Sequence, residues 1–176
     1  MRKFLRHITL TLMLYIGIAN AQAGDNLYKL PYNLVDEQGR SVKLITWQGR
    51  KAFITMEYAT CQFICSIAVN QLKTLQKIVA ARHADYEILI ISLDPEHDTP
   101  LAWKKYRAAR GLSYTNWHYY VSNLKDMPAI ASLIGINYWN ADNQIMHDFR
   151  ILRVDEYGVV QQAIDGFGSD LDAFVK

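Results

Sequence analysis

The sequence has 176 residues, of which 51% are apolar and 20% are charged, and it contains two cysteines. This composition excludes an intrinsically disordered chain, and a globular protein of this length buries enough surface to fold without a disulfide framework. Two cysteines permit at most one intramolecular bridge, so any cysteine chemistry is local. The length predicts a single domain.

The first 23 residues predict a secretory signal peptide that precedes this domain. A basic start is followed by an uncharged apolar run at 8–18 and then by small residues at alternate positions, which is the order of a cleavable signal. The apolar run is shorter than the roughly 20 residues that span a bilayer. We expect cleavage after Ala21 or Ala23, which leaves one domain, 24–176, in the periplasm without a stable membrane span. An uncleaved signal would anchor the protein to the membrane.

The charge balance excludes a nucleic-acid-binding role. The whole chain has 19 Lys and Arg residues against 17 Asp and Glu, a formal charge of +2. Cleavage removes Arg2, Lys3 and Arg6, which leaves 16 basic residues against the same 17 acidic ones and a formal charge of −1. No Lys/Arg cluster longer than two remains, so the mature domain lacks the basic surface that phosphate binding needs. We expect it to be a monomer.

The hydrophobic pattern predicts strands that alternate with helices. Two extended segments, 28–34 and 41–45, predict a hairpin at the edge of a sheet. Further along the chain we expect strands at 51–58, 87–93 and 117–121, helices at about 65–83, 100–111 and 124–134, a closing hairpin at 147–154 and 159–164, and a helical tail from about 170. The alternation predicts a three-layer α/β sandwich with a central mixed sheet and an added N-terminal hairpin.

An acidic segment lies between the second central strand and the helix that follows it. Asp94, Glu96 and Asp98 have the spacing of calcium ligands, but the segment lacks the glycine and the final glutamate of a calcium-binding loop. Pro100 suits a first helical turn, so Asp98 or Thr99 is expected to cap the helix.

Cys61 and Cys65 stand four positions apart where a strand is expected to end and a helix to begin, which is the layout of thioredoxin-like folds. A structural disulfide is disfavoured, because positions i and i+4 of a helix hold their Cβ atoms about 5–6 Å apart, whereas a disulfide needs about 3.5–4.5 Å. The unpaired N–H groups and the dipole at a helix start favour thiolates. Two uses stay open: thiol–disulfide exchange, or binding of a soft metal ion such as Cu(I).

A histidine is the natural third ligand, and it would also accommodate Cu(II) or Zn(II). His7 lies in the signal, and simpler roles fit His83 at a helix end, His97 in the acidic segment and His118 in a strand. His147 is predicted to open a strand after an irregular polar loop, and ligands gather at strand ends on one edge of an α/β sheet. The layout therefore favours His147.

Three segments in this order carry a resemblance to a known family. They are the strand and C-x-x-x-C element that contains 60–65, the loop 91–100, and the late His147 with the apolar strand and Asp-x-x-Gly turn that follow it. From about residue 28 to 168 the chain resembles the Sco/SenC family. These are thioredoxin-fold proteins that deliver copper to the binuclear copper site of cytochrome oxidase or reduce its cysteines.

The resemblance implies that Cys61, Cys65 and His147 bind one copper ion per chain, Cu(I) or Cu(II), and that Asp94 supports the site without binding metal. It implies a client protein as partner, such as a cytochrome oxidase subunit. Thioredoxin-type oxidoreductases carry a proline just before the strand that faces the cysteines. No proline lies near residue 147, and the histidine found there favours metal binding over general thiol exchange.

The sequence departs from the family pattern beside the ligands. Ser66 follows the second cysteine where proline is usual, Gln62 to Ile64 replace a frequent Pro-Asp pair, and Asp148 follows the histidine where Ser or Thr is common. These differences leave the ligand set intact. We predict a copper metallochaperone. The alternative is an enzyme, a thiol–disulfide oxidoreductase with Cys61 as the attacking thiolate and Cys65 as its partner, and a peroxidase is a weaker option.

The polar loop at 137–143, just before His147, carries two large aromatic rings, Tyr138 and Trp139. Aromatic side chains in this region are most simply packing residues. Their position near the predicted metal ligand also makes the loop a candidate docking site for a partner.

Overall fold

A computed structural model describes residues 23–61, 64–142 and 144–176, without the side chains of residues 64–66. The predicted signal peptide therefore lies, except for its last residue, outside the described chain. Within the described ranges, no helix has the length and apolar character needed to cross a membrane.

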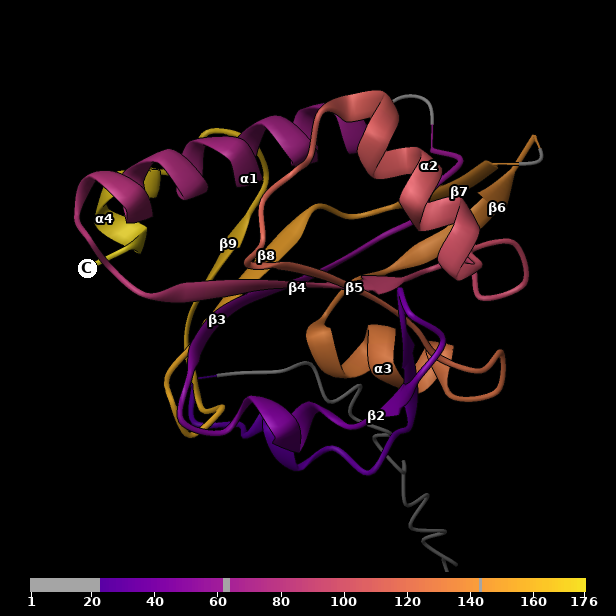
Figure 1. Ribbon diagram of the computed structural model, residues 1–176, viewed down its shortest axis with the longest axis horizontal. Helices are drawn as coiled ribbons and strands as arrows, with labels where there is room; N and C mark the ends of the chain where they lie inside the picture. Colours follow the sequence, from indigo (N-terminus) through magenta and orange to yellow (C-terminus); the bar gives the residue numbers. More distant parts are fainter. Residues whose placement is uncertain (1–22, 62–63, 143) are drawn as a thin grey trace, which may run out of the picture.

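The described residues form a mixed seven-stranded sheet, as predicted (Figure 1). Its strand order is β2-β1-β5-β4-β3-β8-β9, with β3, β4 and β5 parallel and the outer pairs antiparallel. The strands are β1 (Leu34–Asp36), β2 (Ser41–Val42), β3 (Lys51–Glu57), β4 (Tyr86–Ser92), β5 (Trp117–Val121), β8 (Arg150–Val154) and β9 (Val160–Asp165).

Helices cover both faces of this sheet and complete the three layers (Figure 1). One face carries α1 (Ile64–Ala81), α2 (Pro100–Arg110) and the short α4 (Leu171–Phe174). The other carries α3 (Met127–Ile134) and two 3-10 turns, η1 (Leu27–Lys29) and η2 (Leu44–Trp47). The central strands are buried on both faces, which explains why their sequences are nearly unbroken apolar runs.

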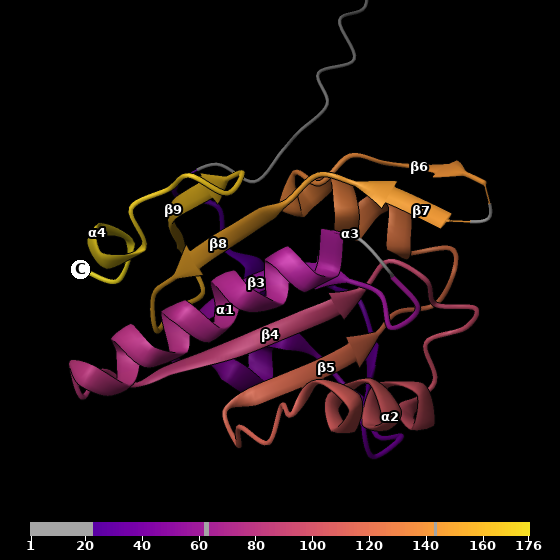
Figure 2. The ribbon, with the colours of Figure 1, turned by 90° about the horizontal axis from the view of Figure 1, so that it is seen from above.

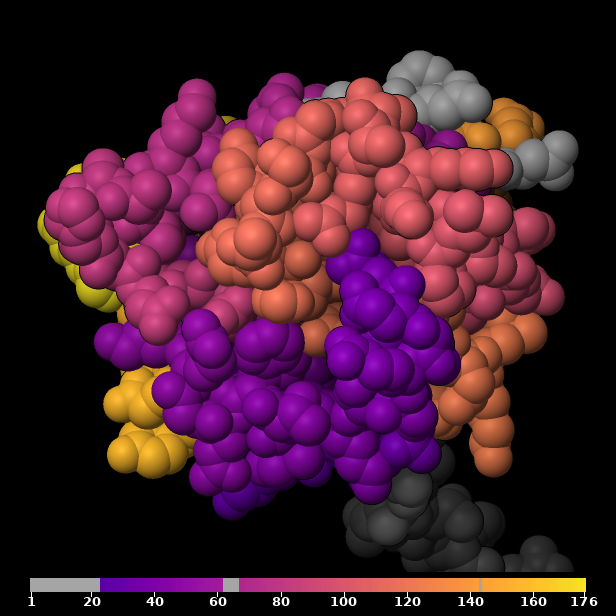
Figure 3. All heavy atoms as spheres, viewed as in Figure 1, coloured from indigo at the N-terminus to yellow at the C-terminus, as the bar shows by residue number. Residues whose placement is uncertain are grey.

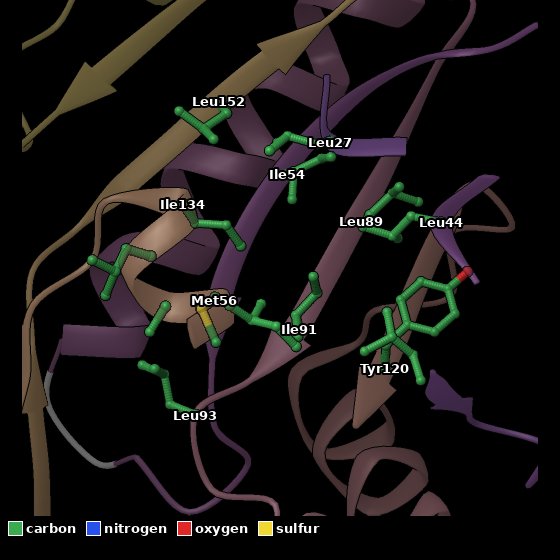
Figure 4. Packing of buried hydrophobic residues seen from close by; sticks show 14 of the residues in the cluster. Leu27, Leu44, Ile54, Met56, Leu89, Ile91, Leu93, Tyr120, Ile134 and Leu152 are labelled. Atoms are coloured by element: carbon green, nitrogen blue, oxygen red, sulfur yellow. The ribbon is translucent and has the colours of Figure 1, made fainter. Parts of the chain in front are cut away.

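Alternate side chains of each central strand enter the two cores. Ile54 and Met56 of β3 pack with Leu89 and Ile91 of β4 against the α3 layer (Figure 4). Phe53, directly before Ile54 in sequence, points to the opposite face and belongs to the core under α1 and α2. This two-residue periodicity holds the carboxyl ends of β3 and β4 in register, with Glu57 opposite Ser92.

Both ends of α2 and the end of α3 lie within a residue of the predicted positions, whereas α3 begins at Met127 and not at 124. Thr99 caps α2 by accepting a hydrogen bond from the Ala102 N–H (3.1 Å), which decides between the two predicted caps. Gly111 and Gly135 end the two helices in the left-handed conformation, at φ of 62° and 82°, which glycine adopts without a steric penalty.

The N-terminal hairpin lies at the sheet edge, as predicted, but its strands are shorter than expected. Residues 28–34 are mostly a 3-10 turn and irregular chain, and only β1 and β2 pair, with β1 also joining β5. The Asp36 carboxylate accepts hydrogen bonds from the N–H groups of Gln38 and Arg40 and closes the turn. In Figure 3 the indigo-to-violet N-terminal segment covers the lower part of the visible face and reaches α2, where Arg107 donates to Glu37 (2.8 Å).

The segment that ends at His147 differs from the prediction, which had an irregular loop followed by a strand that begins at His147. Residues 138–141 and 144–147 form two strands, β6 (Tyr138–Ala141) and β7 (Gln144–His147), which pair in a separate two-stranded sheet. His147 ends β7 and does not open the next strand, which begins at Arg150. The prediction was wrong because the strands are short and half-exposed, so the apolar alternation is weak. Figure 2 shows this hairpin beyond the start of β8, at the same end of the molecule as the start of α1.

Candidate metal site

Cys61, the first predicted ligand, lies in the turn after β3. Its N–H donates a hydrogen bond to the Tyr58 carbonyl (3.3 Å), and its side chain is 5% exposed among the apolar residues of the α3-side core. Cys61 precedes the first residue of α1, Ile64, by three positions, and the positive end of a helix dipole stabilises a nearby thiolate. Cys65 is in the first turn of α1, but its side chain lies outside the described residues.

His147, the predicted third ligand, is held with one ring nitrogen directed to the protein backbone. The side chain is 4% exposed, and Nδ1 lies 2.8 Å from the Asp148 carbonyl oxygen. A carbonyl only accepts, so Nδ1 carries the proton and the lone pair of a neutral ring lies on Nε2. The buried Nε2 makes no well-formed hydrogen bond within the described chain. Metal-binding histidines commonly have this arrangement.

The structure brings Cys61 and His147 together, although they come from distant parts of the sequence. Burial lowers the pKa of His147, but its interaction with the Cys61 side chain, its hydrogen bond to the Asp148 carbonyl and the negative charges of Cys61 and Glu57 raise it, and the net direction is upward. A sulfur and an imidazole that interact in a buried site are donors that suit copper. The side chains fit two of the three ligands that the resemblance implies.

Tyr58 joins the cysteine turn to the β6–β7 hairpin. Its ring meets the His147 ring edge-on, with centroids 5.9 Å apart and an interplanar angle of 71°. Its hydroxyl donates a long hydrogen bond to the Gln144 side chain (3.4 Å). Tyr58 therefore packs behind the imidazole and limits its movement.

Asp98, one of the two candidate helix caps, has a different role. Its carboxylate accepts hydrogen bonds from the Ala59 N–H (3.0 Å) and from the Ser92 hydroxyl (2.6 Å), and Ser92 in turn accepts from the Asp94 N–H. Burial raises the pKa of Asp98 to about 6, against the opposing effect of these hydrogen bonds. The network fastens the acidic segment after β4 to the cysteine turn.

Glu57 is a site residue that sequence reasoning missed. It ends β3, is 1% exposed, and accepts a hydrogen bond from the Tyr106 hydroxyl (2.9 Å). Burial raises its pKa to about 7, although Tyr106, His147 and Arg110 act in the opposite direction. Arg110 lies 4.0 Å from the Tyr106 ring centroid and donates to the Cys61 carbonyl (3.3 Å). The available signal was a carboxyl group at the end of an otherwise apolar strand, directly before the cysteines.

Asp94, which the resemblance places in support of the site, binds a histidine outside the predicted ligand set. Its carboxylate oxygens lie 2.8 and 3.0 Å from His97 Nδ1. Both residues line a surface hollow of about 690 Å³ between the acidic segment and the β6–β7 hairpin, together with Glu96, Asp142 and Gln144. His118, in contrast, pairs with Glu87 (2.7 Å) elsewhere in the fold.

The full ligand set is not assembled by the described side chains alone. Among them, no three His, Cys, Asp or Glu residues are grouped so that they could hold a metal ion. Cys65 stands outside that set because its side chain is not described. The described part of the site is therefore one sulfur and one imidazole nitrogen.

The chain matches one protein-family model and is similar to a known sequence of the same family. The family model described as SCO1/SenC matches residues 20–166. The SCO1 protein homolog of Bacillus subtilis (strain 168) is 25% identical over 140 residues, which cover 77% of this chain and 72% of that protein.

Solved structures share the fold. Arabidopsis thaliana ScoI with copper bound has a TM-score of 0.73 and 17% identity, over 88% of this chain and 94% of that one. BsSco, described as a Sco-family cytochrome c oxidase assembly protein with a disulfide switch, has a TM-score of 0.73 and 24% identity, over 86% of this chain and 91% of that one. The predicted thioredoxin-like α/β fold with a central mixed sheet is confirmed.

Proposed function

Because the chain belongs to the SCO1/SenC family, we propose that it is a metallochaperone that binds one copper ion through Cys61, Cys65 and His147 and delivers it to a client. The client that we propose is the binuclear copper centre of cytochrome oxidase. The main support for this proposal is the orientation of the His147 ring. Its Nδ1–H donates to the Asp148 carbonyl, and its Nε2 lone pair lies in a buried site beside Cys61. Copper bound to the Arabidopsis relative supports the proposal.

Each of the three proposed ligands has a distinct role in copper binding. Two thiolates would hold Cu(I), since soft sulfur ligands select it, and the His147 imidazole would complete the site and accommodate Cu(II). Both cysteines must lose their protons, so binding releases protons and depends on pH. A disulfide between Cys61 and Cys65 would exclude copper, so the redox state of the pair would separate loaded from empty protein.

We also propose that the protein works in the periplasm. Residues 1–23 would direct export and be removed, and the remaining domain would meet its client as a monomer. An oxidising compartment makes the redox state of the cysteine pair a variable of the cell, because disulfides form and persist there.

The second candidate function is reduction of a client's disulfide. The interaction between His147 and Cys61, together with the helix start, would favour the Cys61 thiolate that attacks such a bond. The attack would form a mixed disulfide, which Cys65 would resolve. The burial of Cys61, at 5% exposure, disfavours this reading because an attacking thiolate must reach its target.

His147→Ala tests the proposal. Metal analysis of protein purified with reduced thiols, followed by titration with Cu(I) and Cu(II), should give one copper ion per wild-type chain. The variant should bind copper much more weakly and keep any disulfide reductase activity. His83→Asn is a matched control, since His83 is exposed beyond the opposite end of α1 and asparagine tolerates its positive φ of 51°. Unchanged copper binding by His147→Ala, with loss of reductase activity, would favour the enzyme instead.

A further inference from the structure

Glu57 is a buried carboxyl group outside the proposed ligand set. It lies on the same side of β3 as Phe53, at 1% exposure. Tyr106 donates to its Oε2 atom (2.9 Å), while Oε1 is buried and has no hydrogen-bond partner among the described residues. An apolar side chain of similar size would occupy this position without the free-energy cost of burying a carboxyl group. Packing therefore does not explain Glu57.

The groups that act on Glu57 belong to the proposed copper site. Glu57 ends β3, and Cys61 follows it by four residues in the turn after the strand. Tyr106 donates to the Glu57 carboxyl group (2.9 Å) and lies under Arg110, 4.0 Å from its ring centroid. Arg110 in turn donates to the Cys61 carbonyl (3.3 Å). The charges of Cys61 and His147 act on the pKa of Glu57, which supports this proximity. The carboxyl group therefore acts electrostatically on the site from beside it.

Charge arithmetic shows what such a group does to a metal site. Two thiolates and a neutral imidazole have a charge of −2, so the complex with Cu(I) has a net charge of −1 and the complex with Cu(II) is neutral. A nearby buried carboxylate repels the complex that is more negative, and this repulsion is strong where water is excluded. An ionised Glu57 would thus weaken Cu(I) binding relative to Cu(II) binding.

We propose that the Glu57 carboxylate shifts the preference of the site toward Cu(II), beyond the preference that its three ligands alone would have. Glu57 is then a specificity-determining residue that acts through its charge and contacts no copper. This inference rests on the proposed function, because it needs copper at Cys61, Cys65 and His147.

Glu57→Gln removes the charge and keeps an oxygen to accept from Tyr106. Dissociation constants for Cu(I) and Cu(II) are measured separately on reduced, full-length mature protein, without oxygen and in competition with chelators. The measurements use pH 8, above the pKa of about 7 to which burial raises Glu57. The ratio of the Cu(II) to the Cu(I) dissociation constant should rise about tenfold in the variant, which is the order expected from one buried unit charge.

Glu87→Gln is a matched control. Glu87 is also a buried strand glutamate, but it lies near the start of β4, at the opposite end of the sheet, and pairs with Arg50 and His118. It should leave the ratio unchanged. Glu57→Met is of similar size, carries no charge and should reproduce the effect of Glu57→Gln. It provides the same test if the glutamine variant does not fold.

The outcomes separate the inference from the proposed function. An unchanged ratio in proteins that bind both ions, or an equal loss of both affinities, overturns the role of Glu57 and leaves the chaperone intact. Wild-type protein that binds neither ion overturns both. A ratio that moves toward tighter Cu(II) binding also overturns the inference, because the sign would be reversed.

Discussion

The Asp98 carboxylate accepts a hydrogen bond from the Ala59 N–H at 3.0 Å, across two segments that are well separated in the chain. One segment follows β4 and the other leads from β3 to Cys61. The same carboxylate also accepts from Ser92 at the end of β4. The position of the cysteine turn therefore depends on a side chain that is neither a proposed ligand nor a neighbour of one in sequence.

Asp98→Ala should weaken both the fold and the site. It leaves the Ala59 N–H and the Ser92 hydroxyl without their acceptor, and each such buried group costs about 1–3 kcal/mol. We expect the unfolding free energy to fall by about 2–4 kcal/mol, as urea denaturation would measure. Copper affinity should fall as well, because the Cys61 turn loses its anchor.

The neighbouring Thr99→Ala is the control for Asp98→Ala. It removes the cap of α2, at a cost of about 1 kcal/mol, and should leave copper affinity at the wild-type value. If the two variants changed copper affinity equally, the Asp98 effect would be general destabilisation.

Glu57 should make the stability of the metal-free, reduced protein depend on pH. Burial raises its pKa from the ordinary 4.5 to about 7. A group with a raised pKa in the folded state stabilises fully below its unfolded-state pKa, and this contribution disappears as the pH rises through the folded-state value. We expect the unfolding free energy to decrease from about pH 4.5 to above pH 7, by up to about 3 kcal/mol.

Urea unfolding of wild-type and Glu57→Gln protein at pH 5 and pH 8 measures this contribution. The variant should lose less stability between the two conditions. Asp98, whose pKa burial raises to about 6, gives a similar trend, but it is present in both proteins and cancels in the difference. Parallel profiles would show that Glu57 is ionised at the same pH in the folded and unfolded chains.

Tyr58 should matter to copper binding through its ring. Tyr58→Phe keeps the edge contact with His147 and loses the long hydrogen bond to Gln144, so affinity and stability should change less than when the whole ring is removed. Tyr58→Ala should lower the unfolding free energy by about 3–5 kcal/mol, the usual cost of deleting a buried ring, and should reduce copper affinity. A copper affinity equal in the two variants would show that the ring does not position His147.

Trp139 offers a test of the predicted docking loop. Its side chain is 52% exposed on β6, opposite Met146 of β7, so Trp139→Ala should leave the melting temperature nearly unchanged. If the hairpin meets the client, transfer of copper to that client should slow. Tyr157→Ala, an exposed aromatic in the β8–β9 turn, is the control. Equal transfer rates in both variants would place the docking surface elsewhere.

The sequence contained most of the information for the main sheet and helices. Long apolar runs predicted β3 and β4, and Thr99, one of the two predicted caps, begins α2. These signals are local, because each depends on residues within one or two turns. They identified the strand–turn–helix unit that carries the cysteines.

The rest of the site depends on contacts that no local pattern encodes. The Glu57 partner Tyr106 comes from α2, and the Asp98 partner Ala59 comes from the turn after β3. Asp98 resembled a helix cap in sequence, and only its burial between two segments shows its other role. The β6–β7 hairpin was missed for a related reason, since its strands have four residues each and little apolar alternation.

The β6–β7 hairpin forms its own small sheet, with no backbone ladder to the seven strands among the described residues. Insertions or substitutions at the tip of the hairpin would therefore leave the pairing of the seven-stranded sheet intact. The outer surface of the hairpin can therefore vary to suit different client proteins, while the His147 imidazole at the base of the hairpin stays in position. Among relatives, we expect diversity to concentrate there.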